Sequence, residues 1–162
     1  MAFLTSKPVF PQMSIFSVEW QVSRNITAKK TIFELVPEII IGPPMKMSGK
    51  IRAIVSVKND FAKPAEGIVV RYSLSLLLAK KGTGNGTWMA PFHLEELRIS
   101  KIKPGQIYKI KIIHADLNSQ LKKIKESGFQ ASALKLQVMV EPRPGDSLEK
   151  NVQESVIPVV YR

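Results

Sequence analysis

Residues 68–78 have the sequence IVVRYSLSLLL, and the alternation of side-chain types along this stretch decides the fold class. One face of the stretch holds only apolar or aromatic residues: Ile68, Val70, Tyr72, Leu74 and Leu76. The other face holds Arg71, Ser73 and Ser75. Alternation with a period of two indicates a β-strand that buries one face, and one polar face favours antiparallel pairing.

The same alternation recurs on both sides of this strand. It predicts strands over residues 16–22, 51–58, 108–112 and 134–140, and in the first of these Phe16, Val18, Trp20 and Val22 share one face. Turn residues separate these segments, as in Lys103-Pro104-Gly105-Gln106, where a type II turn is expected. A last strand over 156–161 contains Pro158, which is typical of a sheet edge. About seven to nine short strands with intervening turns predict an immunoglobulin-like antiparallel β-sandwich.

One segment has the period of a helix. The apolar residues of this segment recur at helical spacing, as Leu117, Leu121 and Ile124. Asp116 can cap the N-terminus of the helix, and Gly128 can end it. The sequence therefore predicts one short helix over residues 116–127, inserted into the sandwich.

The domain organisation follows from length and from the distribution of proline. A chain of 162 residues predicts a single domain, here a β-sandwich over residues 46–162. Prolines recur within residues 1–45, which form either an arm or extra strands of the same sandwich.

Composition excludes several classes of site. Apolar residues make up 44% and charged residues 23% of the chain, which is ordinary for a globular protein. The absence of cysteine excludes disulfides and thiolate metal sites, and two histidines exclude a histidine-rich site, so no cofactor is expected.

The sequence also bears on compartment. No apolar run is long enough to span a membrane as a helix. Pro8, Pro11 and Lys7 interrupt the apolar start, so no signal peptide is expected, and an intracellular or virion-associated setting is favoured over secretion. The two sequons, at Asn25 and Asn85, are accordingly expected to be unused.

Positive charge is concentrated in residues 98–125. Seven of the chain's eleven net positive charges lie there, because only Asp116 opposes eight cations. These candidate phosphate contacts are Arg98, Lys101, Lys103, Lys109, Lys111, Lys122, Lys123 and Lys125. A strand face and an adjoining helix would place them on one surface for nucleic acid or anionic headgroups. The alternative is a solvated face whose lysines block strand pairing.

The loop over residues 79–90 is a candidate partner contact. Its glycines indicate a flexible hairpin tip, because a phosphate-binding loop would need a lysine after the glycines and a helix behind it. The candidate contact residues are Lys80, Lys81, Asn85, Trp88 and Met89. Trp88 either anchors a partner or packs beneath the loop.

No constellation predicts catalysis. His93 with Glu95, or His114 with Asp116, supplies a base and its orienting group, but no nucleophile motif accompanies them. Glu95 and Glu96 are adjacent on a strand and face opposite ways. An acidic cluster at residues 146–154 lacks the spacing of a calcium loop.

The order of features from residue 49 onward resembles the CARDB-like branch of immunoglobulin-type sandwiches. The segments that carry the resemblance are Ile54–Asn59, Ala65–Gly67, Ile102–Gln106, Leu134–Pro142 and Glu149–Asn151. The chain differs from the family in having Glu141 at the end of the late strand and in its helix. The resemblance implies an adhesive or structural module without catalytic residues.

Two functions are therefore expected from the sequence. The first is a non-enzymatic structural or protein-interaction module, a subunit of a filament, capsid or surface layer that binds a protein partner or itself. The second is an intracellular or viral nucleic-acid-binding or matrix-type protein that uses the 98–125 basic surface.

Overall fold

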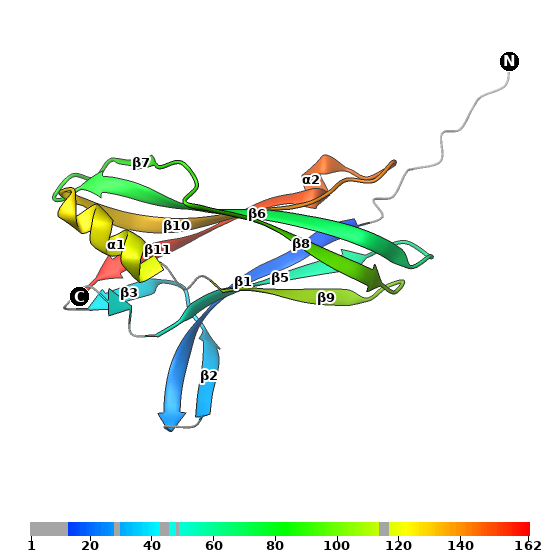
Figure 1. Ribbon diagram of the computed structural model, residues 1–162, viewed down its shortest axis with the longest axis horizontal. Coiled ribbons are helices and arrows are strands. Elements are labelled where there is room, and N and C mark those ends of the chain that lie inside the picture. The colour runs from blue at the N-terminus through cyan, green and yellow to red at the C-terminus, as the bar shows by residue number, and fades with distance from the viewer. Residues whose placement is uncertain (1–12, 28–29, 43–45, 48, 114–116) are drawn as a thin grey trace, which may run out of the picture.

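The computed structural model describes residues 13–27, 30–42, 46–47, 49–113 and 117–162. Within these residues two short helices accompany the strands (Figure 1). The elements are β1 (Met13–Thr27), β2 (Lys30–Leu35), β3 (Ile39–Gly42), β4 (Lys46–Met47), β5 (Ile51–Asn59), β6 (Ala65–Lys80), β7 (Gly86–Trp88), β8 (His93–Ile102), β9 (Ile107–Ile113), α1 (Leu117–Glu126), β10 (Phe129–Val140), α2 (Leu148–Asn151) and β11 (Val152–Tyr161).

The strands form two packed sheets, which confirms the predicted all-β sandwich. The four-stranded sheet has the order β2-β1-β5-β9, and the seven-stranded sheet has the order β4-β3-β11-β10-β6-β7, with β8 also paired to β6. The chain crosses between sheets after β2, β4, β5, β8 and β9. The layer β1-β5-β9 facing β6-β10-β11 corresponds to strands A-B-E facing C-F-G of an immunoglobulin-type sandwich.

The core lies where the predicted alternation places it. Strand β6 directs Val70, Tyr72, Leu74 and Leu76 inward, and each is buried. Strand β10 opposes them with the buried residues Leu134, Leu136, Val138 and Val140. Strands β5 and β9 complete the core from the other sheet with Ala53, Val55, Val57, Ile110 and Ile112.

Strand β1 differs from its predicted pattern at one residue. Phe16 does not share the buried face with Val18, Trp20 and Val22, because its side chain is 64% exposed. The register between β1 and β5 shifts between Ile15 and Ser17, which is the signature of a β-bulge. The extra residue turns Phe16 outward and lets Met13 reach the core.

Strand β3 lies in the other sheet from β1, and it pairs parallel with the end of β11. The expectation that Pro158 marks a sheet edge therefore holds for only part of β11. Beyond Pro158, residues 159–161 pair with Ile39–Ile41, while Pro158 itself lies opposite Ala133 of β10.

Helix α1 confirms the predicted helix and covers one end of the sandwich. Its buried residues are Leu117, Leu121 and Ile124, and it packs against β10. Gly128 ends the helix with a φ of 82°, a left-handed conformation that glycine adopts without strain. Figure 1 shows α1 and the beginning of β10 at the same end of the molecule.

Asn59 connects the two sheets at the opposite end. Its fully buried side chain donates from Nδ2 to the carbonyl oxygens of Lys63 (2.9 Å) and Ile102 (3.0 Å). Its Oδ1 accepts from the N–H of Phe61 at 3.0 Å. Its backbone C=O and N–H also bond to the 103–106 turn, at 2.8 and 3.2 Å. One side chain thus holds the β5–β6 and β8–β9 connections together.

Replacing Asn59 by alanine is expected to lower the free energy of unfolding by about 2–4 kcal/mol, because one buried and one partly buried carbonyl group lose their donor. Urea unfolding of Asn59→Ala measures this loss. The exposed Ser14→Ala change, which removes a hydrogen bond to Asp60, is the control and should cost less than about 0.5 kcal/mol. Equal losses in the two variants would contradict this role of Asn59.

Candidate functional site

Two of the predicted phosphate contacts are neutralised by neighbouring carboxylates. Arg98 Nη2 lies 3.1 Å from Glu96 Oε1, and Lys101 Nζ lies 2.9 Å from Glu66 Oε1. The Lys101 ammonium lowers the pKa of the Glu66 carboxyl by hydrogen bonding and charge. Both cations belong to β8. Glu96 lies two residues before Arg98 on the same strand, whereas Glu66, the partner of Lys101, lies on β6 and is distant in sequence.

The remaining predicted contacts lie on different parts of the molecule. Lys103 lies in the turn between β8 and β9, while Lys109 and Lys111 project from the outer face of the four-stranded sheet. Lys122, Lys123 and Lys125 are exposed on α1, which packs against the other sheet. Figure 1 shows α1 and the β8–β9 turn at opposite ends. The 98–125 run therefore does not form one continuous surface.

The β6–β7 connection is the exposed tip that the sequence predicts. Lys80, Lys81 and Asn85 are all exposed there. Trp88 is half-buried, and its ring lies 4.5 Å from the Lys135 ammonium in a cation–π contact. Met89 packs against the core, and its N–H donates to the Leu76 carbonyl at 3.0 Å. Trp88 and Met89 thus belong to the sheet, while the lysines and Asn85 are free to contact other molecules.

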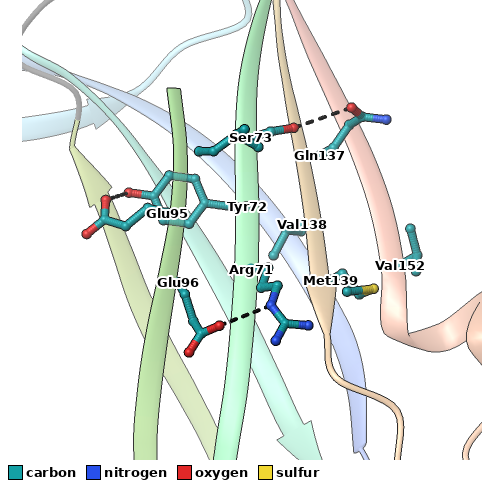
Figure 2. A pocket seen from close by; sticks show the side chains of 10 residues that line it. Arg71, Tyr72, Ser73, Glu95, Glu96, Gln137, Val138, Met139 and Val152 are labelled. Carbon is teal, nitrogen blue, oxygen red and sulfur yellow. Dashed lines mark hydrogen bonds and ion pairs between the residues drawn. The ribbon is translucent and has the colours of Figure 1, made fainter. Parts of the chain in front are cut away.

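The pairing of His93 with Glu95 is present in the structure, and it includes a tyrosine that sequence reasoning missed. His93 Nε2 lies 3.1 Å from Glu95 Oε2. The Tyr72 hydroxyl donates a hydrogen bond to the same carboxylate oxygen (Figure 2). Burial, followed by this hydrogen bond to Glu95, raises the pKa of Tyr72 well above its usual 10.0. The phenol therefore stays protonated at alkaline pH values where an ordinary tyrosine ionises, and its hydroxyl remains a donor to the Glu95 carboxylate. His114 and Asp116 lie outside the described residues.

A groove of about 490 Å³ crosses the outer face of the seven-stranded sheet. Its lining includes Arg71, Leu94, Glu96, Gln137, Met139 and Val152, from strands β6, β8, β10 and β11 (Figure 2). Leu94 is 73% exposed, and Val152 and Val156 are also exposed on this face. Within the described residues no further layer covers this side of the sheet (Figure 1).

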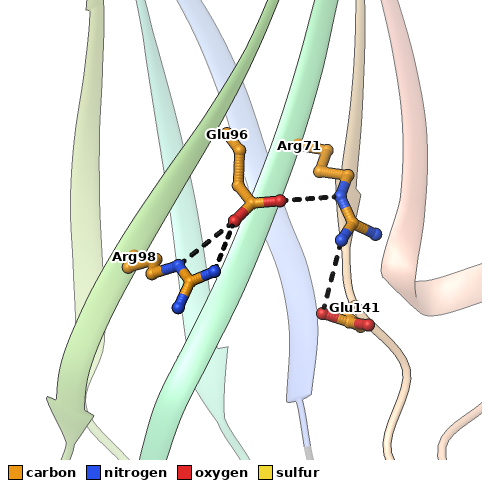
Figure 3. Close-up of polar contacts among 4 residues, drawn as sticks. All are labelled: Arg71, Glu96, Arg98 and Glu141. Carbon is orange, nitrogen blue, oxygen red and sulfur yellow. Dashed lines mark hydrogen bonds and ion pairs between the residues drawn. The ribbon is translucent and has the colours of Figure 1, made fainter.

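A network of ion pairs borders the groove. Arg71 Nε lies 3.1 Å from Glu96 Oε2, and Arg71 Nη2 lies 3.9 Å from Glu141 Oε2 (Figure 3). Arg98 contacts the other oxygen of Glu96. Hydrogen bonds from Arg71 and then Arg98 lower the pKa of Glu96, so this carboxyl is ionised at neutral pH. Sequence reasoning found neither the groove nor this network, because each draws on strands far apart in the chain.

The acidic cluster at residues 146–154 has a local structural role. Asp146 Oδ2 accepts hydrogen bonds from the Arg143 N–H (2.9 Å) and from Asn151 Nδ2 (3.2 Å). Glu154 instead faces β10, where it accepts a hydrogen bond from Gln137. Among the described residues no group of three or more histidine and acidic side chains has a geometry that could hold a metal ion.

Comparisons with known proteins assign no family. No family model matches the chain, and no curated protein matches it. A solved β-glucosidase from Erythrobacter marinus is 15% identical with a TM-score of 0.33; the alignment covers 89% of this chain and 15% of that one. A likeness this low carries no inference about activity. In the described part of the chain, neither helix is long and apolar enough to cross a membrane.

The raised pKa of Tyr72 predicts a specific alkaline behaviour. A phenol whose pKa is higher in the folded chain than in the unfolded chain stabilises the fold below the unfolded pKa, and this stabilisation is lost as pH rises through the folded pKa. The free energy of unfolding should therefore fall as pH rises above about 10. Urea unfolding over a pH series should show a shallower fall for Tyr72→Phe than for the unchanged protein. Parallel pH dependences would contradict this environment for Tyr72.

Proposed function

We propose that this chain is a non-enzymatic structural module that assembles with copies of itself through the outer face of the seven-stranded sheet. The supporting observation is the groove with its exposed apolar side chains, Leu94, Val152 and Val156. Exposed apolar groups gathered on one uncovered face mark an interaction surface more often than scattered ones do. The resemblance to CARDB-like modules is in keeping with this role.

The charges around the groove favour a second copy as the partner. Three cations project from this face, Arg71, Arg98 and Lys135, and three carboxylates accompany them, Glu96, Glu141 and Glu154. Their formal charges cancel, whereas the whole chain carries a net charge of +11. Copies that approach through this neutral face avoid the repulsion that a net charge of +11 would otherwise produce.

The layout of the face also suits self-pairing. A two-fold axis places the same patch of both copies in contact, which requires a self-complementary surface. Here Leu94 and Val152 can meet their counterparts at the centre. The Arg71–Glu96 network lies beside them and offers both signs of charge to the other copy. An apolar centre with a polar surround is the usual anatomy of a protein interface.

Replacing Leu94 by lysine tests this surface. The mass of the unchanged protein, measured by sedimentation equilibrium over a concentration series, should rise towards that of a dimer or a larger assembly. Leu94→Lys should weaken association by at least about tenfold, because it buries an unpaired charge in place of an apolar anchor. Leu35→Lys is the matched control, since Leu35 is 66% exposed on β2, in the other sheet, and should leave association unchanged.

Three results would count against the proposal. A mass that stays monomeric at every concentration excludes self-assembly. Equal effects of Leu94→Lys and Leu35→Lys place the contact elsewhere. Loss of association in high salt would indicate an electrostatic contact, because apolar contact surfaces do not dissociate as ions screen charge.

A further inference from the structure

Lysines from two distant segments meet at one end of the molecule. Lys80, the last residue of β6, pairs with Phe129, the first residue of β10. Helix α1 ends at Glu126, just before that strand. The β6–β7 tip and the C-terminal turns of α1 therefore lie at the same end (Figure 1). We define the basic end as Lys80, Lys81, Lys122, Lys123 and Lys125.

These five lysines differ from the paired cations of β8. All five are exposed, and within the described residues none forms an ion pair. The acid that accompanies them on α1 is Glu126. Unpaired ammonium groups at one end of a molecule raise the local positive potential and attract phosphates, whereas ion-paired cations contribute little field.

A second feature of this end is a groove of about 230 Å³ beside the tip, lined by both polar and apolar residues. It is lined in part by Lys80, Thr83, Gln130 and Ser132. The Thr83 hydroxyl and N–H both donate to the Lys80 carbonyl, at 2.7 and 2.9 Å, and form a turn in the tip. Next to Lys80 in the sheet, the ring of Phe129 is 46% exposed. The basic end thus combines cations, hydrogen-bonding groups and an exposed aromatic ring.

We propose that the basic end binds single-stranded nucleic acid, with its lysines on the phosphates and Phe129 stacked on a base. Stacking on an aromatic ring requires an unpaired base, which selects a single strand over a duplex. Lysine contacts to phosphate carry no sequence information, so binding should be insensitive to base sequence.

A lipid surface is the less favoured ligand for the same lysines. A helix that binds a membrane surface inserts its apolar face between the lipids. In α1 that face is already used, because Leu117, Leu121 and Ile124 are buried in the core. One exposed phenylalanine leaves little apolar surface for insertion.

The test compares two variants of equal net charge by fluorescence anisotropy with a labelled poly-dT oligonucleotide. The first replaces Lys80, Lys81, Lys122 and Lys125 by glutamine. The control replaces Lys63, Lys103, Lys109 and Lys111, which are exposed on other parts of the molecule. Thermal unfolding should be the same for both, because none of these side chains is buried.

The unchanged protein should bind with a steep dependence on salt. If four phosphates are contacted, affinity should fall about 50-fold between roughly 50 and 200 mM salt. The basic-end variant should lose most of this dependence, and the control should keep it. Phe129→Ala should weaken binding to the oligonucleotide about five- to 150-fold while leaving binding to heparin, which has no bases, unchanged.

Several outcomes would overturn the proposal. They are binding that does not depend on salt, equal losses in the two lysine variants, and an unchanged affinity in Phe129→Ala. Tighter binding to phosphatidylserine vesicles than to the oligonucleotide, abolished in the basic-end variant, would assign the lysines to a lipid surface. Because Leu94 lies away from the basic end, Leu94→Lys should bind the oligonucleotide normally, which separates this test from that of self-assembly.

Discussion

The pairing of β6 with β10 is the constraint on which the other features of this protein depend. The two strands pair from Lys80 and Phe129 at one end to Val70 and Val140 at the other. On its second edge β6 pairs with β8 and then with β7, so it is a central strand along most of its length. Its alternation therefore sets two surfaces at once: the inward residues make the core, and the outward residues make the floor of the groove.

The length of this strand pair also explains the position of α1. The four-stranded sheet lies against β6 and β10 over the middle of the sandwich, and α1 packs against β10 at the end (Figure 1). At this end of the sandwich, helix α1 supplies the apolar surface that a strand would otherwise supply, through its buried residues Leu117, Leu121 and Ile124. Covering the end with a helix has an electrostatic consequence, because it brings the lysines of α1 beside the β6–β7 tip.

The sequence predicted those features that depend on local patterns. The alternation over residues 68–76 and the helical period from Leu117 to Ile124 each reflect one buried face. A short stretch of sequence is enough to identify such a face. The turn at Gly105 and the helix end at Gly128 also follow from residues that adopt positive φ, at 68° and 82°. The bulge at Phe16 and the parallel pairing of β3 with β11 were not predictable in this way, because each depends on a partner strand distant in sequence.

Charge shows the same division between local and distant information. A count along residues 98–125 groups eight cations, yet it cannot show that Arg98 and Lys101 are paired with carboxylates while the lysines of α1 are not. Nor can it show that Lys80 and Lys81, which belong to another segment of the sequence, lie at the same end of the molecule as the lysines of α1. Three-dimensional proximity thus divides the net charge of +11 unevenly, leaving one sheet face neutral and one end strongly basic.

Because these two surfaces share β6 but no residue, contact through the neutral sheet face leaves the basic end accessible. A pair of copies would then carry two basic ends, and a strand long enough to reach both would bind more tightly than either end alone, by effective concentration.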